Sequence, residues 1–149
     1  MYTIIFDWKR TLYDPESKTL IQDSLQLLKF LKQKKINIIL IGKGGSEMNQ
    51  EVERLKIRKY FTTIIFQEGQ KDENLFSPFI SKMNPKLTII IGDRVRSELE
   101  IGNELRTITI WVKQGKFSVE KPLNKNQKPT YTVDSLITLK KLLNNKFFK

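Results

Sequence analysis

The sequence YTIIFDWKRT, residues 2–11, carries the clearest structural signal in the chain. Its apolar, β-branched first half predicts a buried strand that ends at the carboxylate of Asp7. A second run of this kind, LTIII at residues 87–91, ends at Gly92 and Asp93. Two buried strands that each place a carboxylate at their carboxyl end are typical of an open α/β sheet with a metal-assisted site.

Short apolar runs alternate with helical patterns along the rest of the chain. This alternation predicts a parallel sheet with helices on both faces, and right-handed crossovers bring the carboxyl ends of its strands to one edge. We therefore predict an α/β fold over residues 1–143, a single domain with a doubly wound parallel sheet of five strands, followed by a basic tail at 144–149. Asp7, Gly42 and Asp93 are expected to meet at the carboxyl edge. The predicted strands are residues 2–6, 37–41, 63–66, 87–91 and 107–112, and the predicted helices are residues 20–34, 50–56, 73–83, 95–105 and 133–143.

The amino-acid composition limits which chemical groups the protein can use in a functional site. The 149 residues suit one domain with its own core. The chain has no cysteine and no histidine, which excludes disulfides, thiolate metal sites and a histidine general base. No apolar run approaches the roughly 20 residues that span a bilayer, and the N-terminus lacks a signal-peptide pattern. We therefore expect a cytoplasmic protein with no membrane partner, whose chemistry relies on carboxylates, lysines, hydroxyls or backbone groups.

The formal net charge of +11 has two interpretations. It is consistent with an anionic partner such as a phosphorylated molecule or nucleic acid. The same net charge would also result from an AT-rich coding sequence, which encodes many lysines. The lysines are spread along the chain, with the densest run at residues 113–128, and aromatic residues are not interleaved with them as in RNA-binding modules. The charge alone therefore assigns neither a partner nor an oligomeric state.

Four elements, in order, resemble the haloacid dehalogenase-like (HAD) hydrolase superfamily, most of whose members are phosphatases. The pattern of that superfamily is a strand ending in Asp-x-Asp-x-Thr, a strand ending in Thr or Ser, a Lys, and Gly-Asp followed by a further acid. In this chain the elements are FDWKRT at residues 6–11, IILIGKG at residues 38–44, Lys71, and GDRVRSE at residues 92–98. The resemblance extends over about residues 1–143 and implies a Rossmann-like sheet.

The resemblance also implies roles for single residues. Asp7 stands at the position of the nucleophile, which attacks phosphorus and forms an aspartyl-phosphate. Mg²⁺ would be held by Asp7, by the backbone carbonyl of Lys9 and by Asp93, with Glu98 as a second acid at the metal. Lys71 would clamp the phosphoryl oxygens.

Each of these roles has a structural alternative. Asp7 is alternatively a strand-end acid paired with Lys9. Asp93 and Glu98 are alternatively acids placed near a helix N-terminus, where the helix dipole favours them. Lys71 is alternatively a solvated lysine ahead of a helix.

Two positions depart from the superfamily pattern. Lys9 replaces the aspartate that protonates the leaving group, and Gly42 replaces the hydroxyl that holds phosphate, with Lys43 next to it as a substitute anion contact. Loss of general acid–base help typically costs about 10²–10⁴-fold. That loss still leaves activity on a substrate with a good leaving group, such as an acyl or aryl phosphate. An ion pair between Lys9 and Asp7 would instead hold Asp7 anionic and displace the metal.

The spacing of the elements leaves no room for a cap domain. The intervals from Asp7 to Gly42 and from Gly42 to Lys71 each hold a turn and one helix, so we expect an open site. We predict a Mg²⁺-dependent phosphatase that acts through Asp7 on a phosphorylated small molecule or macromolecule. The alternative is a catalytically silent HAD-like domain that binds a phosphorylated, protein or nucleic-acid partner. A Lys9 side chain paired with the site acids would favour the silent domain.

Overall fold

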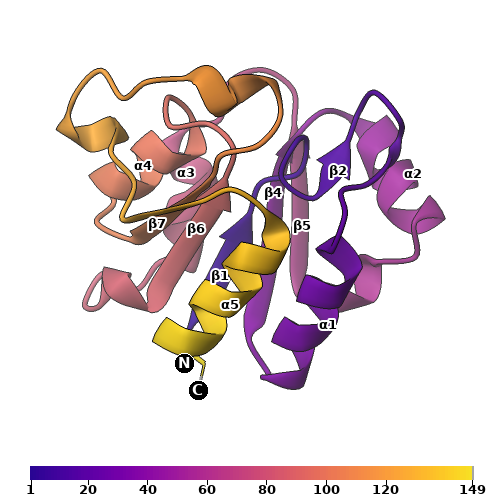
Figure 1. Cartoon of the computed structure of the whole chain (residues 1–149), viewed down its shortest axis with the longest axis horizontal. Helices are drawn as coiled ribbons and strands as arrows, with labels where there is room; N and C mark the ends of the chain where they lie inside the picture. Colours follow the sequence, from indigo (N-terminus) through magenta and orange to yellow (C-terminus); the bar gives the residue numbers. More distant parts are fainter. Residues whose placement is uncertain (149) are drawn as a thin grey trace.

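Six parallel strands form one sheet at the centre of the molecule, in the order β5-β4-β1-β6-β7-β8 (Figure 1). The computed structural model describes residues 1–148. The predicted α/β architecture with a parallel sheet is confirmed, but the predicted number of five strands is wrong. The sixth strand is short and follows a long irregular segment, so it has no periodicity of its own to read. The strands are β1 Thr3–Phe6, β4 Asn37–Lys43, β5 Thr63–Gln67, β6 Thr88–Gly92, β7 Ile108–Val112 and β8 Tyr131–Val133.

Helices cover both faces of the sheet, because the strands are apolar on both sides. In β1, Ile4 and Phe6 belong to a cluster that includes leucines of α1 and α5. Between them, Ile5 points to the opposite cluster, which contains Phe76 of α3 and Leu99 of α4. Such two-sided burial is characteristic of parallel sheets. The helices are α1 Ser24–Gln33, α2 Ser46–Arg54, α3 Glu73–Phe76, α4 Glu98–Glu104 and α5 Leu136–Lys146.

The strand order reverses at β1, which pairs with β4 on one side and with β6 on the other. From β1 the chain continues to β4 and β5, and then crosses to β6 on the far side of β1. Ligands of open α/β sheets bind outside the carboxyl ends of the strands at such a reversal. Asp7 follows β1 at this point, and its backbone N–H donates to the carbonyl of Ile91 at 2.9 Å.

A tight turn redirects the chain immediately after Asp7. The carbonyl of Trp8 accepts hydrogen bonds from the backbone N–H groups of Thr11, Leu12 and Tyr13 at 3.0–3.2 Å. The Trp8 indole is fully buried and stacks on Tyr13 with ring centroids 4.8 Å apart. The turn leads into a small antiparallel hairpin, formed by β2 (Tyr13–Asp14) and β3 (Thr19–Leu20).

Helix boundaries differ from the predicted ones where local chemistry or tertiary packing intervenes. The helix predicted over residues 73–83 ends at Phe76 and passes into a 3₁₀ turn, because Pro78 has no N–H to continue the helical ladder. Helix α4 begins only at Glu98, three residues later than predicted.

The C-terminal helix continues into the segment that we expected as a tail. Helix α5 ends at Lys146 and Phe148 is buried, while the ring of Phe147 lies edge-on to Tyr2 at 5.4 Å between centroids. Lys149 lies outside the described residues. Within residues 1–148, no helix has the length and apolar character needed to cross a membrane.

Candidate active site

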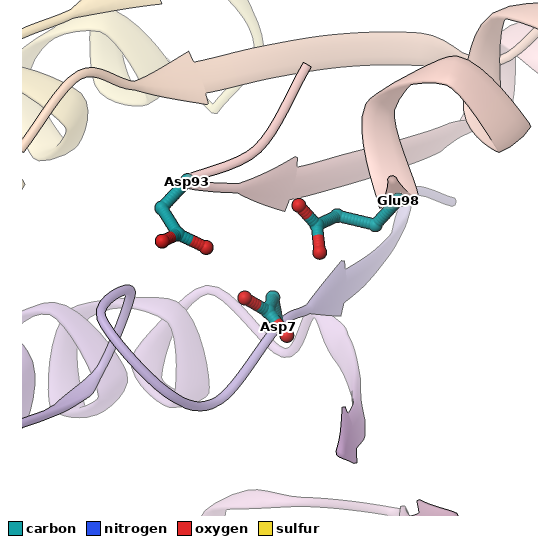
Figure 2. A group of neighbouring side chains, drawn as sticks. All are labelled: Asp7, Asp93 and Glu98. Atoms are coloured by element: carbon teal, nitrogen blue, oxygen red, sulfur yellow. The ribbon is translucent and has the colours of Figure 1, made fainter. Parts of the chain in front are cut away.

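Three carboxylates meet beyond the carboxyl ends of β1 and β6 (Figure 2). Asp7 follows β1, Asp93 follows β6, and Glu98 is the first residue of α4. One oxygen of each lies within 4.8 Å of those of the other two. All three side chains are buried, with at most 8% of each residue exposed. The structure therefore brings together the three acids that the sequence suggested as metal ligands.

Lys71 enters the same cluster from the loop between β5 and α3. Its ammonium forms an ion pair with Asp7 and a second one with Glu98, at 3.4 Å from Glu98 Oε1. Only 4% of the Lys71 side chain is exposed, so it is not the solvated lysine of the alternative interpretation. The other oxygen of Asp7 accepts a hydrogen bond from Thr11 Oγ1 at 3.2 Å.

Asp7 and Lys71 are held in their charged forms. Burial opposes ionisation of Asp7, but the Lys71 ammonium and hydrogen bonds to the carboxylate outweigh it and lower the pKa of Asp7. Burial also disfavours the Lys71 ammonium, and the charges of Asp7 and Glu98 outweigh that effect and raise the pKa of Lys71. An ionised, positioned carboxylate is what a nucleophile at this position requires.

The two remaining acids hold protons in the absence of a cation. Burial, with the charges of Asp7 and Glu98 acting in the same direction, raises the pKa of Asp93 to about 10. Burial and the charge of Asp7 raise the pKa of Glu98 to about 7. With both of these acids ionised, the cluster would carry more negative charge than Lys71 alone neutralises.

The donor set fits a small divalent cation. Three carboxylates against one ammonium leave two negative charges to balance. The oxygen Oδ2 of Asp93 is buried and has no hydrogen-bond partner among the described residues. Carboxylate oxygens are the ligands that Mg²⁺ prefers in proteins, and buried acids of this kind are normally paired or bound to metal. Asp7, Asp93 and Glu98 are the residues that would hold it.

Gly92 makes the position of Glu98 possible. A Cβ at residue 92 would lie 2.5 Å from Cγ and 2.7 Å from Cδ of Glu98. The missing side chain is therefore what lets the Glu98 carboxylate reach the cluster. The backbone N–H of Arg94 donates to Glu98 Oε2 at 3.0 Å and fixes it there.

Lys9 lines the cavity in front of the acids but does not pair with Asp7. No ion pair of Lys9 occurs within residues 1–148, and Lys71 is the partner of Asp7 instead. The pairing of Lys9 with Asp7, which we considered from the sequence, is thus replaced by one that involves Lys71. Lys9 lies near Glu47, whose pKa it helps to lower together with backbone hydrogen bonds, chiefly that from Gly45.

Gly42 is packed against two aromatic residues. A Cβ at this position would lie 2.6 Å from Cε1 of Phe66 and 2.7 Å from Cβ of Trp8. The space in which the superfamily pattern has a hydroxyl is therefore filled from β5 and from the turn after β1. Lys43, the next residue, lines the same cavity as Asp7.

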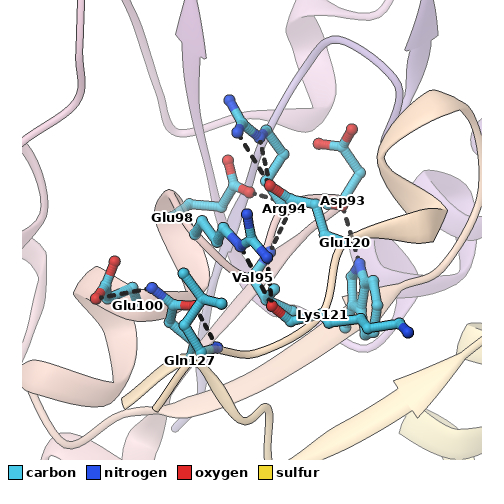
Figure 3. Close-up of polar contacts among 11 residues, drawn as sticks. Asp93, Arg94, Val95, Glu98, Glu100, Glu120, Lys121 and Gln127 are labelled. Atoms are coloured by element: carbon cyan, nitrogen blue, oxygen red, sulfur yellow. Dashed lines mark hydrogen bonds and ion pairs between the residues drawn. The ribbon is translucent and has the colours of Figure 1, made fainter.

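Sequence reasoning missed the part played by the segment between β7 and β8. Glu120 accepts hydrogen bonds from the backbone N–H of Val95 at 3.1 Å and from Arg94 Nη2 at 3.0 Å (Figure 3). The carbonyl of Lys121 accepts two more from Arg96, at 2.8 and 3.2 Å. The segment thereby anchors residues 94–97, which join Asp93 to Glu98. Only its high charge marked it in the sequence.

Solved structures share this fold at low sequence identity. An uncharacterized protein from Listeria monocytogenes serotype 4b matches with a TM-score of 0.78 and 16% identity, covering 97% of this chain and 98% of that chain. D,D-heptose 1,7-bisphosphate phosphatase from B. bronchiseptica, complexed with magnesium and phosphate, matches with a TM-score of 0.74 and 15% identity, covering 98% and 99%. The putative HAD-hydrolase YfnB from Bacillus subtilis, bound to magnesium, matches with a TM-score of 0.69 and 21% identity, covering 85% and 57%.

The family comparison supplies the classification. No curated protein matches the sequence as a relative. The family model described as HAD-hydrolase-like matches residues 43–139, which is more than half of the chain. The matched region contains Lys71, Asp93 and Glu98, and the solved structures extend the likeness over β1 and Asp7. The chain belongs to the HAD-hydrolase-like family.

Proposed function

We propose that this protein is a Mg²⁺-dependent phosphohydrolase that acts through an aspartyl-phosphate on Asp7. The observation that carries the proposal is the buried cluster of Asp7, Asp93 and Glu98 with Lys71 at the strand reversal. When bound there, Mg²⁺ would neutralise negative charge on the phosphoryl oxygens and orient the group for attack. The solved relatives from B. bronchiseptica and Bacillus subtilis, which carry magnesium, support this choice of metal.

Asp7 performs the covalent chemistry in two displacements. In the first, a carboxylate oxygen of Asp7 forms a bond to phosphorus while the bond to the leaving oxygen breaks, and the leaving group departs with that electron pair. In the second, water attacks the same phosphorus and the Asp7 carboxylate leaves, which releases inorganic phosphate and a proton. Lys71 lies against Asp7 and would hold the phosphoryl oxygens through both steps.

Lys9 determines which substrates suit the site. It lines the same cavity as Asp7, at the position where the family pattern has a carboxylic acid. Its ammonium stabilises negative charge on a departing oxygen, but it does not replace the carboxylic acid that supplies a proton in the family pattern. We therefore expect acyl and aryl phosphates, whose leaving groups need no proton, to be the best substrates.

The proposal is tested by hydrolysis of acetyl phosphate and p-nitrophenyl phosphate by the full chain, with Mg²⁺ and with EDTA. Turnover should require Mg²⁺ and disappear in Asp7→Asn, which keeps the shape of the side chain but not the nucleophile. The matched control is Asp23→Asn, since Asp23 lies just before α1, outside the lining of the cavity, and makes no side-chain hydrogen bond within residues 1–148. Equal turnover by Asp7→Asn and the control would refute the assignment of the nucleophile.

The second candidate is a catalytically silent domain that binds a phosphorylated partner. The observation in its favour is the packing of Trp8 and Phe66 into the space beside Gly42, which leaves no room there for a phosphate-holding hydroxyl. A folded protein that binds inorganic phosphate or Mg²⁺ but turns over neither substrate would favour this candidate. Magnesium-independent turnover that still needs Asp7 would instead indicate a metal-free hydrolase.

A further inference from the structure

The cavity in front of the acids is far larger than a single phosphoryl group. Its volume is about 670 Å³, within the range of pockets that hold whole metabolites or drug-sized ligands. It is also unusually basic, because seven of its seventeen lining residues are lysine or arginine, against 27 of 149 in the whole chain. The site is therefore built to receive more than the group that reacts.

The cations of the rim come from four separate segments at the carboxyl edge of the sheet. The loop after β1 provides two of them, the last residue of β4 provides one, the loop after β6 provides two, and the segment after β7 provides one. We refer to this set as the basic rim, and its members are Lys9, Arg10, Lys43, Arg94, Arg96 and Lys116. Convergence of four segments on one cavity is not explained by a solvated lysine-rich surface alone.

Within residues 1–148, four of the six rim cations form no ion pair, although Lys9 lies near Glu47. Arg10 pairs with Glu16, and Arg94 pairs with Glu120. Within residues 1–148, no ion pair involves the others, which are Lys9, Lys43, Arg96 and Lys116. Arg96 donates only to the carbonyl of Lys121, which leaves its charge uncompensated.

The inner cluster does not use this positive charge. With a divalent cation and Lys71, the charges of Asp7, Asp93 and Glu98 are already balanced. The phosphoryl group that reacts brings two further negative charges, against the four unpaired cations of the rim. The outer lining adds two acids, Glu100 and Glu104, and neither forms an ion pair with a rim cation within residues 1–148. The unpaired cations of the rim are therefore available to a second anionic group on the same ligand.

The wall of the cavity holds some of these cations rigidly. The Arg94 guanidinium lies 4.1 Å from the centroid of the Phe117 ring and is also fixed by Glu120. The ammonium of Lys116 lies 5.1 Å from the same centroid. Cations that are positioned before binding lose little entropy when they contact an anion.

We propose that the substrate is a phosphomonoester that carries a second phosphate group, which the basic rim binds, with Lys116 and Arg96 as its principal contacts. The proposal rests on the proposed phosphohydrolase function, because it assumes that the reacting phosphate lies at Asp7. A free second phosphate on a small molecule and the next phosphodiester of a nucleic-acid end offer this same chemistry. The test separates these two sources.

The experiment measures binding as well as turnover, so that failure of catalysis does not hide the result. Calorimetry on Asp7→Asn with Mg²⁺ compares a nucleoside 5′-monophosphate, the corresponding nucleoside 3′,5′-bisphosphate and a dinucleotide with a 5′-phosphate. We expect the bisphosphate to bind about tenfold or more tightly than the monophosphate, since charge-assisted hydrogen bonds contribute about that much each. The preference should shrink as salt is raised from 50 to about 500 mM.

Substitutions in the basic rim test whether it causes the preference for the bisphosphate. Lys116→Gln and Arg96→Gln, each in the Asp7→Asn protein, should reduce the ratio of the monophosphate to the bisphosphate dissociation constant severalfold. The control is Lys29→Gln, at an exposed lysine of α1, which should leave this ratio unchanged. Tight binding of the dinucleotide as well as the bisphosphate would identify a nucleic-acid end, and tight binding of the bisphosphate alone would identify a small molecule. Equal binding of all three ligands would overturn the proposal.

Turnover by the unmodified chain separates the two proposals. If the bisphosphate binds more tightly in calorimetry but no phosphate ester is hydrolysed, the proposed phosphohydrolase function is refuted. The proposal that the basic rim binds a second phosphate is then retained. Hydrolysis that depends on Mg²⁺ and Asp7, with no preference for the second phosphate in either kcat/KM or binding, would retain the phosphohydrolase and refute the rim specificity.

Discussion

At the scale of single residues, the site keeps the acids and the lysine of the HAD-like pattern but has Lys9 and Gly42 beside them. One buried cluster contains Asp7, Asp93, Glu98 and Lys71. In this cluster the attraction between opposite charges favours the ionised side chains, whereas burial disfavours them. Lys9 stands at the edge of this cluster without pairing with its acids. Lys9 therefore leaves the three acids together, and under the proposed function it would change the proton supply to the leaving group.

Replacement of Lys9 by aspartate should increase phosphatase activity. Lys9→Asp restores a carboxyl group where the family pattern has one, and general acid catalysis typically contributes about 10²–10⁴-fold. We expect at least a 10²-fold increase in kcat/KM for an alkyl phosphate and a smaller one for p-nitrophenyl phosphate. Steady-state kinetics on both substrates measure this, with Lys29→Asp as the control for the change in net charge. An equal, small change in both variants would show that proton supply does not limit the reaction.

Gly42 should tolerate no side chain while its aromatic neighbours remain. Gly42→Ala places a Cβ 2.6 Å from Phe66 Cε1 and 2.7 Å from Trp8 Cβ, and overpacking of this kind costs about 1–3 kcal/mol. The melting temperature should fall by several degrees and partly recover in the double variant Gly42→Ala with Phe66→Leu. An unchanged melting temperature in the single variant would contradict the packing that we describe.

The residue types of the site could be predicted from the sequence, but their packing could not. Asp7 and Asp93 follow apolar strands, and their meeting at one edge is a consequence of parallel topology. The contact of Gly92 with Glu98, and the filling of the space beside Gly42 by Phe66, depend on side chains from different elements. Such tertiary contacts leave no periodic signal in a single sequence.

At the scale of elements, the segment between β7 and β8 anchors a loop of the site, a structural role that its sequence did not indicate. In the sequence it stood out only as the densest run of lysines, at residues 113–128. Through Glu120 and Lys121 it is bound to residues 94–96, in the loop between Asp93 and Glu98. Strand β8 follows this segment, and the sequence did not predict it because three residues are too few to show a strand pattern.

Glu120 should act on the metal site through this loop. Glu120→Gln keeps an oxygen that accepts from Val95 but removes the ion pair with Arg94, whose backbone N–H holds Glu98. Loss of partners that orient metal ligands typically costs 10–100-fold in affinity. We expect about a tenfold higher Mg²⁺ concentration for half-maximal activity.

The matched control for this variant is Glu53→Gln, which removes the exposed ion pair with Arg58 far from the cavity. Titration of activity with Mg²⁺, together with thermal melts, separates an effect on the metal site from general destabilisation. The same half-maximal Mg²⁺ concentration in both variants would mean that the segment does not position the site.

At the scale of the whole molecule, the sheet concentrates opposite charges at one end. The carboxyl edge brings three buried acids to the strand reversal and surrounds them with the basic rim. This arrangement follows from topology, because all six strands are parallel and all their following loops lie at the same edge. Seven of the 27 lysines and arginines of the chain line this cavity, together with five of its 16 acids.

The stability of the metal-free protein should depend on pH through the acids of the cluster. The folded pKa of Asp93, about 10, and that of Glu98, about 7, both lie above the ordinary values of 3.8 and 4.5. Between the ordinary and the raised pKa, the folded state holds protons that the unfolded chain has released. The contribution of these two acids to stability therefore falls as pH rises from about 5 to 8.

Magnesium should reverse this loss, and its stabilising effect should grow with pH. Binding requires that the two acids give up their protons, which becomes easier as pH rises, whereas Lys71 and Asp7 stay charged throughout this range. At a Mg²⁺ concentration about 100 times the dissociation constant, the gain is about 2.7 kcal/mol, which for a chain of this size raises the melting temperature by about 5–10 °C. We expect this shift at pH 8 and little or none at pH 5, and its disappearance in Asp93→Asn. A shift that is equal at both pH values, or that survives in Asp93→Asn, would place the bound magnesium elsewhere on the molecule.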